Sequence, residues 1–350
     1  MRAFRVLRQL LRQITLVILP TGILYLVLLA ASYILFPKSP EGALDPVLAR
    51  ETFLRTPPTY LTYGSSVIAR DDRINVLLGP SNVSLGFRPH VLNSIFKNAV
   101  FHNMSLGGTS IDGIAAMVDL VFAIRYPREG TGVKFIVGLW YGEFLHNENS
   151  RERTPIAQQM SRFGLFERLE DGYRPTVPLE MFDLMVEALR PYFLIRWLVA
   201  KNGPFFGGED PTLLKTRGLQ ELTCTQQQKS AFRKSPKNPF AEYGTAQFDA
   251  LAELAAQVSQ KGGKLILVDL PHPRCMTKVD NAWQQYQKIK QPLIAKAVSK
   301  GALYWNMQDI DGDHLFMDGT HPNTIGAIAH EKRLIQRLRD YSEQISPKSR

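Results

Sequence analysis

The hydrophobic pattern of the chain begins with one long apolar stretch. Ile14–Phe36 contains no charged residue and is broken only by Pro20. A helix of this length can cross a hydrocarbon core of about 30 Å, so we predict a membrane span. The preceding tail, residues 1–13, carries only basic charges, on Arg2, Arg5, Arg8 and Arg12. The positive-inside bias then places the tail in the cytoplasm and the rest of the chain outside.

Two other interpretations of this stretch are open. Ala30-Ala31-Ser32 offers small residues for signal-peptide cleavage. The apolar run continues beyond them to Phe36, however, and is longer than the usual hydrophobic region of about 7 to 15 residues. A buried core helix would show a polar face, which this stretch lacks. We therefore expect an uncleaved, single-pass anchor in the inner (cytoplasmic) membrane, with the main domain periplasmic or extracytoplasmic.

After a predicted stalk at 37–73, short apolar runs alternate with helical patterns. The expected strands are Ile74–Leu78, Ala99–His102, Phe135–Leu139, Lys264–Leu270 and Ala302–Trp305. The expected helices are His90–Lys97, Ile111–Ile124, Thr245–Lys261, Ala282–Ser299 and Thr324–Leu338. This alternation predicts an α/β fold with a parallel sheet and helices on both faces, in which sites form at the carboxyl ends of strands.

We assign this alternation of strands and helices to one exported domain at 74–345. The alternation is interrupted at about 145–243. Within the interruption, Leu179–Ala200 is a further helix candidate. Loops that follow strands of such a sheet lie near its sites. We interpret the segment as an insertion that overlies the site.

Composition excludes several classes of protein. The net charge is +10, and four of the basic residues are in the tail, so the body is too weakly basic for a nucleic-acid partner. No dinucleotide or P-loop motif occurs. The run Asp309–Asp313 resembles a calcium loop but is followed by His314 in place of the turn glycine, so no metal or cofactor is expected. Cys224 and Cys275 allow one disulfide or two separate thiols.

The first candidate for chemistry follows the first strand. Gly79-Pro80-Ser81-Asn82 places a serine directly after a glycine turn, where its hydroxyl would lie at the carboxyl edge of the sheet. Taken alone, this motif favours a turn or helix-capping role for the serine.

The second candidate precedes the last helix. In Asp318-Gly319-Thr320-His321, the carboxylate can hydrogen-bond one imidazole nitrogen and leave the other to accept a proton from a serine. A capping aspartate and a solvated histidine are the alternative.

Together these segments resemble blocks one and five of the SGNH (GDSL-type) hydrolases, which have a flavodoxin-like three-layer fold. The resemblance implies a catalytic triad of Ser81, Asp318 and His321. Asn103–Ser110 resembles block two, whose glycine donates to the oxyanion; we choose Gly108, with Gly107 as its neighbour. The sequence departs from the family pattern in two places. In block one, Pro80 stands where the family usually has an acidic residue before the serine.

The other departure lies in block three, where the family often has Gly-x-Asn-Asp. The chain has Trp140 and Tyr141 at this place and no asparagine. The indole N–H, the tyrosine hydroxyl and the side chain of Asn82 are all open as the third oxyanion or substrate contact.

An N-terminal anchor combined with these blocks is similar to exported SGNH proteins of polysaccharide O-acetylation and teichoic-acid D-alanylation. This resemblance implies an O-acetyltransferase that uses a Ser81 acyl-enzyme. Its partners would be a glycan acceptor and a multi-span membrane acyltransferase as acyl donor. A carbohydrate esterase or deacetylase with the same triad, and a non-catalytic scaffold for glycan assembly, are the alternatives.

Overall fold

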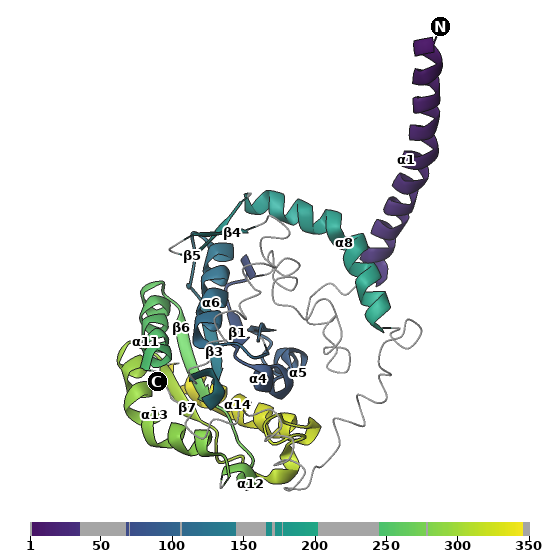
Figure 1. Cartoon of the computed structure of the whole chain (residues 1–350). Coiled ribbons are helices and arrows are strands. Elements are labelled where there is room, and N and C mark those ends of the chain that lie inside the picture. Colours follow the sequence, from purple (N-terminus) through teal and green to yellow (C-terminus); the bar gives the residue numbers. More distant parts are fainter. Residues whose placement is uncertain are drawn as a thin grey trace.

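A five-stranded parallel sheet forms the centre of the protein in the computed structural model (Figure 1). The structure describes residues 2–35, 68–69, 71–105, 107–144, 166–169, 172–176, 178–201, 245–277 and 279–345. The strands of the sheet are β1 (Ile74–Leu78), β2 (Val100–Asn103), β3 (Val133–Leu139), β6 (Lys264–Asp269) and β7 (Leu303–Asn306). Their spatial order, β2-β1-β3-β6-β7, is that of the flavodoxin-like fold, which confirms the predicted fold class.

Helices cover both faces of this sheet (Figure 1). One layer contains α6 (Ile111–Arg125), α11 (Thr245–Gln260) and α13 (Asn281–Ser299), and the other contains α4 (Ser81–Gly86), α5 (Pro89–Ile95) and α14 (Thr324–Ile345). Successive side chains of a strand point to opposite faces. Accordingly, Val76 of β1 is buried in the first core and Leu77 in the second. Burial on both faces explains why the strands are continuous apolar runs rather than alternating ones.

The observed elements lie close to the predicted ones, with the largest difference at the carboxyl end. Helix α14 ends at Ile345, seven residues after the predicted Leu338. The extension has a packing reason, because the ring of Tyr341 meets that of Trp305 on β7 at a centroid distance of 6.2 Å. A helix propagates readily once such tertiary contacts support it.

The described residues at the end of the predicted stalk already pack on the domain. Ile68 is fully buried in the larger core. The buried guanidinium of Arg125 donates to the carbonyls of Ile68 and Asp71 at 2.6 and 2.7 Å. Because several hydrogen bonds satisfy this buried charge, it holds the chain that enters β1. The remainder of the stalk lies outside the described residues.

The predicted insertion contains a hairpin and a long helix among its described residues. Strands β4 (Phe166–Leu169) and β5 (Gly172–Pro175) pair antiparallel, and α8 (Leu179–Lys201) follows. Helix α8 packs against α1 (Arg2–Leu35), which includes the apolar segment (Figure 1). Among the described residues, α1 is the one helix long and apolar enough to cross a membrane. Cys224 lies outside the described residues, so the structure does not test the choice between a disulfide with Cys275 and two separate thiols.

Candidate active site

Two glycines allow the serine-bearing helix to approach the edge of the sheet. Gly79, directly after β1, has a φ of +138°, and a Cβ there would lie 2.6 Å from Val83. A Cβ on Gly138 of β3 would lie 2.3 Å from the same side chain. Val83 therefore fills the space that two absent side chains leave open, and α4 begins at Ser81 directly beyond the sheet. The predicted strand–turn–helix placement of this serine is observed.

Ser81, His321 and Asp318 form a continuous hydrogen-bonded relay. Ser81 Oγ lies 2.6 Å from His321 Nε2. His321 Nδ1 lies 2.7 and 2.9 Å from the two carboxylate oxygens of Asp318. The histidine and aspartate side chains are each 20% exposed. This is the arrangement in which a carboxylate orients an imidazole that takes the proton of a serine.

A compact turn before α14 holds the aspartate and the histidine. The amide of His321 donates to Asp318 Oδ1 at 2.8 Å, and the amide of Met317 donates to the His321 carbonyl at 2.9 Å. Gly319 adopts a φ of +76° between them, a conformation that glycine adopts without steric cost. Asn323 then accepts from the amide of Gly326 at 2.9 Å and caps α14.

Asn82 contacts this turn. Its buried side-chain amide donates to the carbonyl of Thr320 at 2.7 Å. The sequence suggested an oxyanion or substrate contact for Asn82. The structure shows a hydrogen bond that joins α4 to the turn that carries His321, and so places serine and histidine at a defined separation. The oxyanion or substrate contact stays a prediction.

The glycine loop of the predicted second block reaches Ser81 at Gly107. A Cβ on Gly107 would be 3.8 Å from Ser81 Cβ, and Gly108 follows with a φ of +70°. Gly107 is thus the residue shown next to Ser81, while Gly108 was the predicted donor. Asn103, at the end of β2, accepts from Ser105 and donates to the carbonyls of Val83 and Phe87. These bonds join the glycine loop to α4.

The two aromatic residues after β3 have different surroundings. Tyr141 is buried, and its hydroxyl donates to Asp280 at 2.5 Å. Trp140 is half-buried, with its indole N–H buried and without a partner among the described residues. Its backbone N–H donates to Glu143 at 2.9 Å. Burial raises the pKa of Glu143 well above its usual value, and the hydrogen bond from Trp140 opposes this shift.

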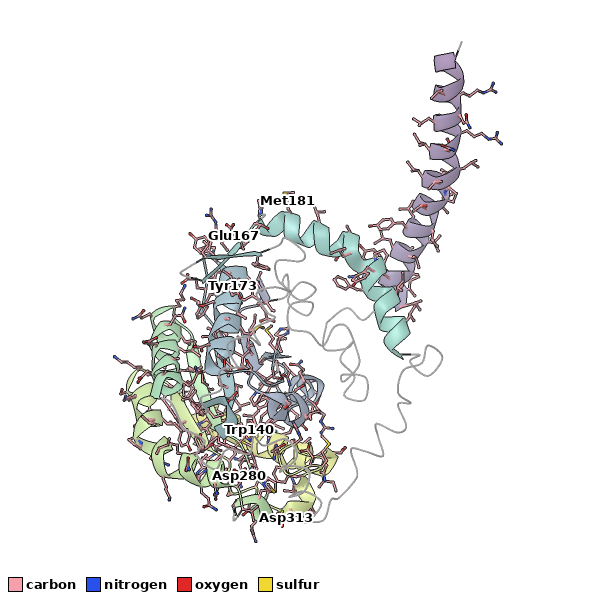
Figure 2. The ribbon with its side chains drawn as sticks, in the orientation of Figure 1. Trp140, Glu167, Tyr173, Met181, Asp280 and Asp313 are labelled. Carbon is pink, nitrogen blue, oxygen red and sulfur yellow. The ribbon has the colours of Figure 1, made fainter. Side chains whose placement is uncertain are left out.

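An aromatic cluster extends from these residues to the end of β6. The ring of His272 lies edge-on to Tyr141 at 5.5 Å and stacks on Trp283 at 5.7 Å. Burial lowers the pKa of His272 to about 4, although the Asp280 carboxylate lies 3.7 Å away and favours the charged form. Figure 2 labels Trp140 and Asp280 in this part of the domain. The sequence did not identify Asp280; its only local signal is its position before the helix α13.

The acidic run beyond β7 is paired with arginines. Asp311 bonds Arg274 at 2.8 Å, and Asp309 bonds Arg333 at 2.7 Å. Asp313 accepts from the backbone amide of Cys275 at 2.8 Å. The carboxylates that resemble the start of a calcium loop in the sequence are thus bonded to protein groups. The same contacts attach the segment before the turn of Asp318 to α12 (Arg274–Thr277) and α14.

Comparison with known proteins gives distant structural likenesses. No family model matches the sequence, and no curated protein does either. A structure from Bacteroides fragilis, provisionally described as an acylhydrolase, is 11% identical, with a TM-score of 0.39 over 81% of this chain and 96% of its own. A GDSL-like lipase from Bacteroides thetaiotaomicron is 10% identical, with a TM-score of 0.41 over 81% of this chain and 98% of its own. The case for the site therefore rests on its geometry.

Proposed function

We propose that the protein is a membrane-anchored serine acyl-transfer enzyme that acts on a cell-surface or secreted polysaccharide. The observation that carries the proposal is the relay from Ser81 through His321 to Asp318 at the carboxyl edge of the sheet. Serine hydroxyls are weak nucleophiles unless an adjacent base takes their proton. A hydrogen bond of 2.6 Å to an imidazole oriented by a carboxylate meets that requirement.

The reaction follows from this geometry in two steps. Ser81 Oγ attacks the acyl carbonyl while its proton moves to His321 Nε2, and Asp318 stabilises the imidazolium. Backbone N–H groups of Ser81 and the Gly107–Gly108 loop hold the oxyanion. Collapse of the intermediate breaks the bond to the leaving group, which takes the proton from His321. An acceptor hydroxyl then attacks the acyl-serine and gives its proton to the same nitrogen. Collapse of this second intermediate breaks the bond between the acyl group and Ser81 Oγ, which regains the proton from His321.

The acceptor class comes from the sequence resemblance together with the helix α1. An anchor in the inner membrane, with the catalytic domain outside it, would keep the site near exported glycan chains. A separate multi-span acyltransferase would supply the acyl group at the same membrane. Acetyl transfer to a glycan hydroxyl is the reaction that fits both partners.

Hydrolysis is the second candidate function. The side chains of His321 and Asp318 are each 20% exposed, so water can approach the base. Water in place of a glycan hydroxyl would make the enzyme an esterase or deacetylase by the same chemistry. Transfer requires the acceptor to compete with water at the acyl-serine.

The nucleophile can be tested by trapping the acyl-enzyme. The full-length chain in detergent would be mixed with a chromogenic acetyl ester and examined by intact mass. We expect a single acetyl adduct on the wild type, none on Ser81→Ala, and strongly slowed formation on His321→Ala. Ser84→Ala, on the same helix, is the matched control and should retain the adduct. An adduct that survives Ser81→Ala would refute the proposal.

Transfer and hydrolysis are then separated by adding acetyl-free oligosaccharides to the acyl-enzyme. Gain of acetyl groups on the sugar, dependent on Ser81, supports transfer. Loss of acetyl groups from acetylated oligosaccharides, with no gain on free ones, supports the esterase.

A further inference from the structure

Helix α8 has one side that is buried in the domain and another that is exposed. Phe193 and Leu194 are buried in the larger core. On another side, large apolar side chains are exposed at positions spaced three and four residues apart, which places them on one face of a helix. These are Met181, Leu184, Tyr192 and Ile195, 50, 71, 40 and 43% exposed, with exposed Ala188 between them. No charged residue occupies these five positions.

Specific polar contacts join α8 to α1. The hydroxyl of Tyr33 donates to Glu187 at 2.7 Å, and that of Tyr25 donates to the carbonyl of Ala188 at 2.9 Å. Buried Arg190 reaches the carbonyl of Ser32 at 3.4 Å. Its guanidinium also lies 4.5 Å from the centroid of the Tyr33 ring.

These contacts define the depth of α8 relative to a membrane. Tyr25, Ser32 and Tyr33 all belong to the last turns of the apolar segment. With about 1.5 Å of rise per residue, Tyr25 is about 15 Å from the end of α1, which is about half of a hydrocarbon core of 30 Å. Polar side chains in lipid need partners inside the protein, and α8 supplies them for both tyrosines.

We infer that α8 is a second membrane-contacting element, whose exposed apolar face inserts into the outer half of the bilayer beside α1. The face is uncharged, and the part of α8 that contacts α1, at Glu187 and Ala188, lies at the depth of acyl chains. Such a helix lies in the interface with its apolar face about 5–10 Å below the headgroups. The occupant of this face is therefore lipid. Figure 2 shows Met181 near the start of α8, at the end of this helix that lies away from α1.

This inference also bears on cleavage of the N-terminus. Ser32 is fully buried and lies where a signal peptide would be cut. Removal of residues before this point would strip α8 of its partner tyrosine, Tyr25. The inference rests on the membrane anchor of the proposed function, but not on its chemistry.

The test uses the full-length chain in vesicles of phosphatidylcholine and phosphatidylglycerol. In a Cys224→Ser/Cys275→Ser background, a fluorescent thiol label is attached to Leu184→Cys or Ile195→Cys. Leu26→Cys, 61% exposed on α1, is the lipid reference, and Lys288→Cys, exposed on α13, is the aqueous one. Brominated acyl chains and aqueous iodide serve as quenchers. A circular dichroism spectrum and a thermal unfolding midpoint like those of the unlabelled chain show that each variant is folded.

We expect brominated lipid to quench the labels at positions 184 and 195 at least half as strongly as the label at 26, and iodide to quench mainly the label at 288. Labels at 184 and 195 that follow 288 while 26 stays in lipid would overturn the inference and leave the anchor intact. Protection from both quenchers would assign the face to a second copy of the chain and also overturn it. If the label at 26 follows 288, the anchor itself fails.

Discussion

The hydroxyl of Ser81 owes its proposed reactivity to two other side chains. The imidazole of His321 accepts its proton, and Asp318 determines which imidazole nitrogen is free to do so. Asn82 contributes indirectly, because its bond to the Thr320 carbonyl fixes the turn relative to α4. Each of these residue types is common in turns, and only their separation makes them a site.

The choice of a third oxyanion donor depends on which candidate side chain has a polar hydrogen that is not already bonded. Tyr141 has one hydroxyl proton, which it gives to Asp280. The amide of Asn82 has two donor hydrogens, one of which bonds the carbonyl of Thr320. The indole N–H of Trp140 is buried and has no partner among the described residues. Buried donors are nearly always paired. Trp140 follows β3, which pairs with β1 in the sheet, so its unpaired N–H at the same edge as Ser81 is the best candidate for a contact made only during reaction.

We therefore predict that Trp140→Phe lowers the kcat for an acetyl ester by about 100-fold or more with little change in KM, the usual effect of losing such a donor. Tyr141→Phe is the matched control, because it removes a neighbouring polar hydrogen that is already engaged. Steady-state kinetics on both variants test this. A larger loss of kcat in Tyr141→Phe would assign the donor role elsewhere.

At the scale of elements, the junction of β1, β3 and α4 decides where the nucleophile lies. The side chain of Val83 packs where Gly79 and Gly138 have no Cβ. A methyl group on Gly138 would lie 2.3 Å from Val83 and 3.1 Å from Leu270. Close-packed interiors accommodate such an addition only by moving a neighbour.

Gly138→Ala is expected to lower the free energy of unfolding by about 1–3 kcal/mol, the usual cost of overpacking, and to slow formation of the acetyl adduct by shifting α4. The double variant with Val83→Ala should recover part of both losses, because it removes the nearer clashing methyl group. Denaturant unfolding and adduct kinetics on the single and double variants measure this. If the losses of the two single substitutions simply add in the double variant, the side chain of Val83 is not the reason that position 138 requires glycine.

The extents of these elements were largely predictable. Strand β1 occupies the predicted residues, and α8 differs from its prediction by one residue. Apolar periodicity is a local property, so it is legible without a fold. The end of α14 was not predictable in this way, because the helix is extended by the packing of Tyr341 on Trp305, which belongs to β7.

For the molecule as a whole, buried histidines couple stability to pH. Burial lowers the pKa values of His272 and His330 to about 4. In the unfolded chain these groups bind protons near pH 6.5. The unfolded state therefore takes up more protons below pH 6.5, and the free energy of unfolding contributed by each histidine falls as the pH drops toward 4.

His330 lies between the rings of Phe87 and Phe316, at centroid distances of 6.3 and 6.1 Å. We predict that His330→Leu flattens the pH dependence of the free energy of unfolding by about 1.4 kcal/mol per pH unit between pH 6 and 5. Burial raises the pKa values of Glu143 and Asp269, which act with opposite sign. The difference between variant and wild type removes their contribution.

Denaturant unfolding of the full chain in detergent, repeated at several pH values, provides this difference. Equal slopes for the two proteins would mean that His330 protonates in the folded state near its ordinary pKa.

By itself the sequence determined the α/β class, the strands, the apolar N-terminal segment and the two motifs that carry the relay. These follow from local periodicity and from short motifs whose residues are close in the chain. That Gly107 lies beside Ser81 in the folded protein is a detail too fine for a motif.

Tertiary structure alone decided the remaining roles. Asn82 and Thr320 are 238 positions apart, and Tyr141 and Asp280 are 139 apart. Tyr25 meets Ala188 across 163 positions. Whether a polar hydrogen is free or engaged depends on which distant backbone or carboxylate folding brings to it, and no local pattern of residues records that.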